Sequence, residues 1–197
     1  MTGPDRTDPD PGAVLVADAR RVLTQWQPPS SAQGDLRGRY LGFIDTHPDA
    51  ASRDLREGHL TASTVVLDDA RERVLLTLHP LAERWFQLGG HLEPGDVSIG
   101  AAALREATEE SGIEGLALVD YPIGLDWHPT RCRDSTRTLG PSSHLDVEYV
   151  AVAPTGAMHL RSDESLDLAW FALDALPDGA DDVVRALIRR IRDLGMA

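Results

Sequence analysis

Three glutamates that lie close together in the chain, Glu106, Glu109 and Glu110, are the residues best suited to chemistry. On a helix, at about 100° per residue, they fall within one arc of about 100° that Ile99 shares. Like charges spaced i,i+4 near the negative end of a helix dipole are unfavourable. Arg105 can offset only one of them. We therefore expect a hard divalent cation that takes oxygen ligands, Mg²⁺ or Mn²⁺.

Such a cation favours chemistry at a phosphate ester or phosphoanhydride. Mg²⁺ usually keeps several waters and binds through a few carboxylates together with substrate phosphates, which differs from a closed structural site. The glycine pair Gly89-Gly90, predicted to form a turn, precedes the acidic helix. The alternative is a solvent-exposed acidic helix with no ligand.

Residues 89–113 resemble the signature of the Nudix hydrolase family, which reads Gly, five residues, Glu, seven residues, then Arg-Glu-U-x-Glu-Glu-x-Gly-U, where U is a bulky aliphatic residue. Gly90 opens the match and residues 105–113 supply its second half. Asp96 stands where the family has its first glutamate, and eight residues separate it from Arg105 in place of seven. Ala107 is small where an aliphatic residue is expected.

The extra residue is expected in the turn before the helix, because Ser98 is a good N-cap and the helical half keeps the family spacing. Gly112 is expected to end the helix in a left-handed conformation. We expect Arg105 to lock the helix to the turn through Asp96 or Glu109, and the extra residue puts the contact with Asp96 in question.

The resemblance implies that Glu106, Glu109, Glu110 and the carbonyl of Gly89 hold Mg²⁺ or Mn²⁺, with Arg105 among the catalytic residues. It also implies hydrolysis of the diphosphate linkage of a nucleoside diphosphate joined to another moiety. A Nudix domain without hydrolytic activity, acting as a nucleotide-ligand sensor or interaction module, is the alternative. A diphosphate isomerase of the same superfamily is a weaker third reading.

The general base is assigned less directly. Glu164 is the candidate outside the signature, because it lies in a loop before a predicted strand, where Nudix proteins often carry a functional acid. A plain exposed loop residue is the equal alternative. Asp146 and Glu148 alternate along one predicted strand face, so they could either enter the site or face solvent.

Contacts to an anionic substrate are expected from Arg84, His91 and Arg131. His91 follows the glycine pair directly. Arg131 belongs to residues 128–144, which we read as a long loop without regular structure, and long loops of this kind often bind ligands.

Composition excludes some partners. The formal net charge is −13 at pH 7 over 197 residues, which opposes binding to a nucleic-acid polymer or an anionic membrane and favours a small-molecule nucleoside diphosphate derivative. The single cysteine, Cys132, excludes an intrachain disulfide and offers no cluster of thiolates for a metal. No apolar stretch of about 18 residues is present. We expect a cytoplasmic protein, with a homodimer as a possible assembly.

The pattern of elements predicts an α/β fold, and the resemblance implies the Nudix-like α/β/α sandwich with a mixed sheet. Residues 1–12 are polar and proline-rich and are predicted to be a disordered tail. Residues 13–58 are predicted to be a helical extension, with helices at 13–26 and 33–46. Residues 59–197 are predicted to form the Nudix domain. Its expected strands are 60–67, 73–78, 85–88, 116–123, 145–153 and one around Trp170, and its last helix is 180–194.

Overall fold

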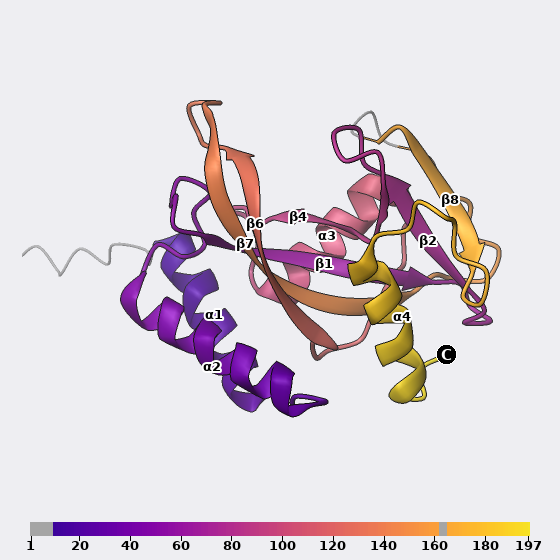
Figure 1. Ribbon diagram of the computed structural model, residues 1–197, viewed down its shortest axis with the longest axis horizontal. Helices are drawn as coiled ribbons and strands as arrows, with labels where there is room; N and C mark the ends of the chain where they lie inside the picture. Colours follow the sequence, from indigo (N-terminus) through magenta and orange to yellow (C-terminus); the bar gives the residue numbers. More distant parts are fainter. Residues whose placement is uncertain (1–9, 162–164) are drawn as a thin grey trace, which may run out of the picture.

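A mixed, curled sheet with helices on both faces forms the centre of the molecule (Figure 1). The computed structural model describes residues 10–161 and 165–197. The helices of these residues are α1 (Pro11–Gln25), α2 (Ser31–Thr46), α3 (Ile99–Ser111) and α4 (Asp182–Asp193). The strands are β1 (His59–Leu67), β2 (Arg73–Leu78), β3 (Trp85–Phe86), β4 (Leu88–His91), β5 (Ala117–Leu118), β6 (Gly124–Arg133), β7 (Leu139–Val152) and β8 (Asp167–Ala172). The predicted α/β class is confirmed.

Strand β1 is the centre of the sheet. It runs parallel to β7, with His59 opposite His144 and Leu67 opposite Val152. On its other edge β1 pairs first with β4 and then with β2, both antiparallel. Strands β3 and β8 pair with opposite edges of β2, while β5 and β6 pair with β7. One parallel pair among antiparallel ones makes the sheet mixed, as expected.

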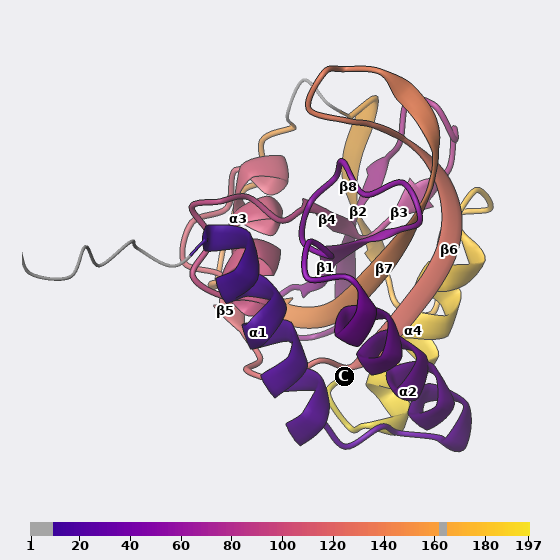
Figure 2. The same cartoon turned by 90° about the vertical axis from the view of Figure 1, so that its left-hand side faces the viewer.

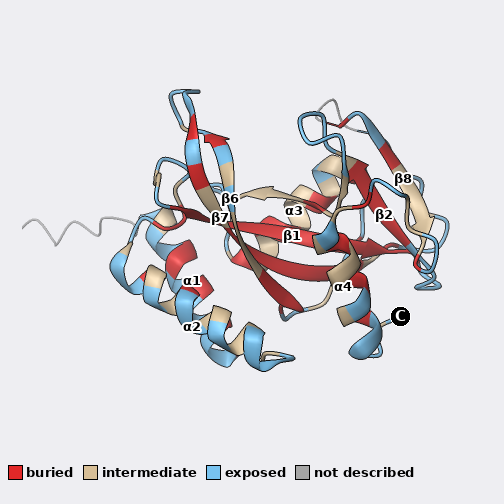
Figure 3. Ribbon diagram, in the orientation of Figure 1, coloured by how far each residue is buried: buried red, intermediate tan, exposed pale blue. Residues whose placement is uncertain are grey.

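Successive side chains of β1 pack into two apolar layers, one on each face of the sheet. Val65 packs in one apolar cluster with Leu187 of α4, whereas Val66 packs in another cluster with Ala107 of α3. Neighbouring residues of a strand point to opposite faces, so α3 and α4 cover opposite sides of the sheet. Figure 3 shows the central strands as a continuous buried layer between them.

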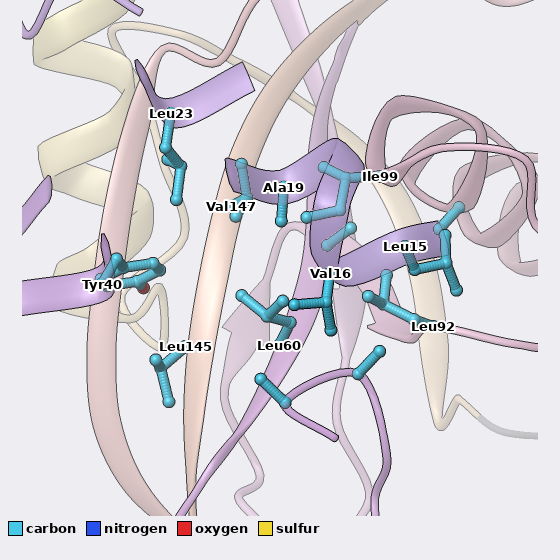
Figure 4. Packing of buried hydrophobic residues seen from close by; sticks show 14 of the residues in the cluster. Leu15, Val16, Ala19, Leu23, Tyr40, Leu60, Leu92, Ile99, Leu145 and Val147 are labelled. Atoms are coloured by element: carbon cyan, nitrogen blue, oxygen red, sulfur yellow. The ribbon is translucent and has the colours of Figure 1, made fainter. Parts of the chain in front are cut away.

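Helix α1 packs beside α3 on the face of the sheet opposite α4, and α2 packs beside α1 and against β6 (Figure 2). Leu15, Ala19 and Leu23 of α1 pack with Leu60 and Leu145 in the largest apolar cluster (Figure 4). The expected helices are therefore present, and they form part of the main core. The division of the chain after residues 12 and 58 stays a prediction.

Helix α1 begins earlier than expected. The Asp10 side chain accepts a hydrogen bond from the Gly12 amide, and Pro11 occupies the first turn, where its missing N–H costs nothing. Residues 11 and 12 therefore belong to the helix and not to the predicted tail. Residues 1–9 lie outside the described part of the chain.

The expected loop at residues 128–144 is wrong, because β6 and β7 form a long antiparallel hairpin there. Only residues 134–138 turn, with the Asp134 carboxylate accepting from the amides of Thr136 and Thr138. Two prolines and several charged residues hide the strand pattern. Pro141 lies opposite Arg131 in the ladder. Pairing of β6 with β7 overrides the weak strand propensity of these residues.

The strand expected at residues 116–123 is also shorter than predicted, since only Ala117–Leu118 pairs with β7. Pro122 has no N–H to donate, so the chain leaves the ladder before β6 begins. Helix α4 is present as expected, and the Asp181 side chain caps it by accepting from the Val183 amide. Among the described residues, no helix combines the length and apolar character needed to cross a bilayer.

Tyr40 connects α2 to the sheet and provides a test of this packing. Its ring is fully buried, and its hydroxyl lies 2.7 Å from the carbonyl oxygen of Asp126 and 2.9 Å from that of Asp146. Tyr40→Phe should remove this buried hydroxyl and its hydrogen bonding to the sheet, and should lower the free energy of unfolding by about 1–2 kcal/mol. Urea unfolding measures the change. The exposed Tyr121→Phe is the control, and an equal loss in both variants would contradict the assignment.

Candidate active site

Helix α3 has the boundaries that the sequence predicts. The Ser98 side chain accepts a hydrogen bond from the Ala101 amide at 3.0 Å, and Gly112 ends the helix in the left-handed region with φ 66°. The extra residue of the signature therefore lies ahead of the helix, in the segment that joins β4 to α3.

The glycine pair lies within strand β4, which corrects the predicted turn. Gly89 is opposite Ser63 and Gly90 is opposite Ala62 in the ladder with β1. Gly89 has φ 153°, and a Cβ atom there would lie 2.5 Å from the Ser63 Cα. Only glycine permits this close approach of the two backbones.

The glycine backbone is in turn covered by carboxylates of α3. The Gly89 amide donates to Glu110 Oε2 at 3.0 Å. A Cβ at Gly90 would lie 2.7 Å from the carboxyl carbon of Glu106, so that carboxylate fills the space beside the glycine. Glu109 points elsewhere, with its side chain 61% exposed. Glu106 and Glu110 thus share the inner face, whereas Glu109 lies at its solvent edge.

Arg105 holds the helix to the preceding segment. Its guanidinium donates to both carboxylate oxygens of Asp96, at 2.9 and 3.0 Å, and to the carbonyl oxygen of His91 at 2.9 Å. It also donates to Glu106 at 3.1 Å and to Glu109 at 3.0 Å. The contact with Asp96 is therefore made despite the extra residue, and the shorter Asp suffices.

Two carboxyl groups of this network have opposite pKa shifts. Burial raises the pKa of Glu106, and this effect exceeds the lowering by Arg105. Burial also acts to raise the pKa of Asp96, but hydrogen bonds from Arg105 and from the Glu93 amide bring it below its usual value. Glu106 therefore retains a buried charge that is incompletely compensated, and a cation bound beside it would offset that charge. Hard oxygen donors at this position fit Mg²⁺ or Mn²⁺.

A cavity of about 430 Å³ adjoins the glycine strand. Its walls bring together backbone, hydroxyl, amide and carboxylate groups from β1, β4, α3 and β7. These include Thr61, Ser63, Gln87, Gly89, Glu110 and Asp146. A larger cavity of about 800 Å³ lies between the start of α1 and residues 48–54, without Glu106 or Glu110. The clustered carboxylates, and not cavity size, therefore locate the candidate site.

Asp146 lies in the cavity wall, as one of the two readings of its strand allowed. It is buried and accepts hydrogen bonds from the hydroxyls of Thr61, at 2.9 Å, and Ser63. Burial raises its pKa. Thr61 and Ser63 were missed from the sequence, although two polar residues at alternate positions of an apolar strand are a usable signal. Gln87 was missed too, and its buried Oε1 has no hydrogen-bond partner among the described residues.

The three residues predicted to contact the substrate, Arg84, His91 and Arg131, do not gather at this cavity. Arg84 pairs with Asp181 at 3.2 Å, and Arg131 is exposed on β6, so neither side chain lines the cavity. His91 lies next to the glycine pair, but its Nε2 is 2.9 Å from Cys132 Sγ. Burial, with Arg53 nearby, lowers the pKa of His91 to about 3, so its ring is neutral and brings no charge to a phosphate. Glu164 lies outside the described residues.

Residues 58–191 match the family model of the NUDIX domain. The chain belongs to the Nudix family. Its described carboxylates and glycine strand are those of the Nudix signature. Asp96 and the extra residue before Arg105 depart from that signature. The structure accommodates both, because Arg105 still bonds to the two carboxylate oxygens of Asp96.

Among curated proteins, the Nudix chain is similar to the NAD-capped RNA hydrolase NudC of Pseudomonas aeruginosa, with 30% identity over 141 residues. The match covers 70% of this chain and 45% of that protein, so the chain spans less than half of the length of this relative.

Two solved structures support the Nudix fold. One is a NUDIX family hydrolase from Clostridium perfringens, with TM-score 0.51, 24% identity and coverage of 69% of this chain and 97% of that chain. The other is a MutT protein from Methanosarcina mazei, with TM-score 0.54, 14% identity and coverage of 73% and 99%. At these identities the likeness concerns the fold, and the predicted Nudix-like architecture is confirmed.

The pair of Asp96 and Arg105 should contribute to stability. The Asp96 side chain is 5% exposed, and Asp96→Ala would remove both of its bonds to a guanidinium that stays partly buried. We expect the free energy of unfolding to fall by about 2–3 kcal/mol, measured by urea unfolding. Asp120→Ala, at an exposed position, is the matched control. A loss no larger than that of the control would refute the locking role of Arg105.

Glu148 should make stability depend on pH. Its side chain is 2% exposed and pairs with Arg190 at 2.7 Å, yet burial raises its pKa to about 8. In an unfolded chain this pKa is about 4.3. The folded state therefore binds the Glu148 proton more tightly than the unfolded state does. The stability that the protonated Glu148 contributes to the fold is fully present below about pH 4.3 and is lost as pH rises towards 8.

Glu148→Gln should remove the loss of folding stability that ionisation of Glu148 causes at high pH. We expect the stability of the wild type relative to this variant to decrease between pH 5 and pH 8.5, as measured by urea unfolding at each pH. Glu114→Gln, at an exposed position, is the control for the substitution itself. A constant or rising difference for Glu148→Gln would contradict the raised pKa.

Proposed function

We propose that this Nudix chain is a metal-dependent hydrolase that cleaves the diphosphate linkage of a nucleoside diphosphate joined to another moiety. The observation that carries the proposal is the placement of Glu106 and Glu110 against the Gly89-Gly90 backbone, where Glu110 and both glycines line a cavity. Glu106 is partly buried and burial raises its pKa, so a cation bound beside the two carboxylates best explains their arrangement.

Glu106, Glu110 and the backbone carbonyl of Gly89 would hold Mg²⁺ or Mn²⁺, with Glu109 at the solvent edge of the set. When bound, such an ion polarises phosphoryl oxygens and lowers the pKa of a coordinated water. Arg105 acts as a positioning residue, since its guanidinium is already bonded to Asp96, Glu106, Glu109 and the His91 carbonyl.

The cavity wall opposite α3 would orient the substrate. Ser63 and Thr61 donate to Asp146, which fixes their oxygens, and the Gln87 side-chain nitrogen lies 3.4 Å from the Ser63 hydroxyl. The buried Gln87 carbonyl oxygen is left as an acceptor. Glu164 stays the proposed general base, on sequence grounds alone.

Two observations support the proposed substrate class, the similarity to a curated protein and the net charge of the chain. By its name, the Pseudomonas relative acts on NAD-capped RNA, in which a dinucleotide contains the diphosphate. The net charge of −13 opposes a long polyanion. We therefore propose a small dinucleotide or nucleoside diphosphate derivative, in a cytoplasmic setting, and a short NAD-capped RNA is a test of the nucleic-acid alternative. A homodimer is a separate proposal.

The test is release of phosphate-bearing products from NADH, ADP-ribose, diadenosine tetraphosphate, a nucleoside triphosphate and a short NAD-capped RNA, with Mg²⁺, with Mn²⁺ and with chelator. Metal-dependent cleavage of a small compound is the expected result. Cleavage of the capped RNA alone would contradict the small-molecule assignment. Binding without cleavage across the panel would refute the hydrolase and favour the sensor, the second reading of the sequence.

Glu110→Gln should lower turnover by at least about a hundredfold, because it removes a charge that the metal requires. Its side-chain oxygen can still accept from the Gly89 amide, so the fold should be retained. Circular dichroism and steady-state rates measure the two effects. Glu114→Gln, an exposed residue just beyond α3, is the control and should keep full activity. Near-normal turnover of Glu110→Gln would exclude this metal site.

A further inference from the structure

Four potential metal ligands meet on four neighbouring strands, beside the candidate active site. They are His59 of β1, His91 of β4, Cys132 of β6 and His144 of β7. One ligand atom of each lies within 4.8 Å of the others. His59 and Cys132 are buried, and the other two are partly buried. The sequence spreads these residues over 86 positions, so only the sheet brings them together.

Register places the three histidines on one face. His59 is directly opposite His144 in the parallel pair, and His91 is opposite Thr61, which lies two residues after His59. Alternate residues of a strand share a face. The three ring centroids are 5.1 to 5.2 Å apart, almost an equilateral triangle. The β6–β7 hairpin curls over this part of the sheet (Figure 1). Cys132 of β6 thereby reaches the histidines, with its Sγ 2.9 Å from His91 Nε2.

The distances around the cysteine fit shared coordination. Cys132 Sγ lies 2.9 Å from His91 Nε2 and 3.6 Å from His144 Nε2. In tetrahedral zinc sites, bonds of about 2.3 Å to sulfur and about 2.0 Å to nitrogen place these ligand atoms about 3.5 Å apart. The sulfur therefore touches two imidazole nitrogens at once, at a spacing close to that of ligands around one ion.

His59 provides an independent sign of a missing partner. Its Nδ1 lies 3.3 Å from the Ser142 hydroxyl and 3.4 Å from the Leu55 carbonyl, which orients the ring. Its Nε2 is buried and has no hydrogen-bond partner in the described part of the chain. A buried polar atom without a partner costs free energy. A carbonyl near one ring nitrogen and a free lone pair at the other is the usual state of a histidine that binds metal.

We propose that His59, His91, Cys132 and His144 bind one Zn²⁺ ion, as a structural site separate from the Mg²⁺ or Mn²⁺ site of the glutamates. Imidazole and thiolate are the ligands that zinc prefers, whereas carboxylates suit Mg²⁺ and Mn²⁺. Four protein ligands complete a tetrahedron and leave no position for a water or a substrate, which is the pattern of structural zinc.

The proposed zinc would cross-link the edge strands of the active site. His91 directly follows Gly90, and His144 lines the same cavity as Asp146. The ion would therefore fix β4 and the β6–β7 hairpin on β1, independently of any substrate. Because unfolded chains lack a preformed site, binding of such an ion stabilises the folded state.

The first test is the metal content of the full chain purified without chelator from cells grown with added zinc. Mass spectrometry of the metals should find about one zinc per chain. Cys132→Ser and His59→Ala should each lower the zinc content at equal free zinc by at least about tenfold. His159→Ala, which changes a histidine outside the group, and Glu110→Gln, which changes the carboxylate site, should keep it.

A second measurement does not depend on the folding of the variants. Wild-type chain stripped of metal and titrated with Co²⁺ should develop a thiolate-to-cobalt charge-transfer band and the visible absorption of tetrahedral cobalt, and Zn²⁺ should abolish both. Zinc addition should also raise the melting temperature of the wild type. Absence of both zinc and the cobalt bands would overturn the site. Loss of zinc in Glu110→Gln but not in Cys132→Ser would also overturn it, by placing the ion at the carboxylates.

Discussion

The contact between a side-chain-free stretch of β4 and the carboxylates of α3 is the constraint on which the site depends. Gly89 approaches Ser63 so closely that no Cβ fits, and its amide bonds to Glu110. The Glu106 carboxylate fills the space beside Gly90. A side chain at Gly89 would push β4 away from β1, and one at Gly90 would displace the Glu106 carboxylate. The acids, the cavity wall and the strand are therefore positioned by one packing requirement.

The two ends of β1 explain how one strand serves both core and site. At its C-terminal end, Val65 and Leu67 pack under α4. At its N-terminal end the same face carries His59, Thr61 and Ser63, which α4 does not cover. Hydroxyls there bond to Asp146, and the imidazole lies in the histidine and cysteine group. A change from apolar to polar residues along one face thus separates the packed half of the sheet from the chemical half.

Much of the local structure could be predicted from the sequence, because its causes lie within a few residues. Ser98 and Gly112 bound α3 through a hydrogen bond and a backbone conformation that need no distant partner. The apolar stripe of α4 repeats at helical spacing, so that helix was also predicted. The signature led to the Nudix family, and the match over residues 58–191 confirms it. Residue types and their spacing were enough for these features.

Contacts between distant residues were decided only by the tertiary structure. The sequence places Asp96 one position further from Arg105 than the Nudix signature does, and only the folded chain shows the guanidinium bonded to both carboxylate oxygens. Residues 128–144 read as a loop, yet pairing of β6 with β7 makes them strands. Cys132 reads as isolated, and the curl of that hairpin brings it to three histidines. Register and sheet curvature are properties of the whole fold, so no local pattern could encode these neighbours.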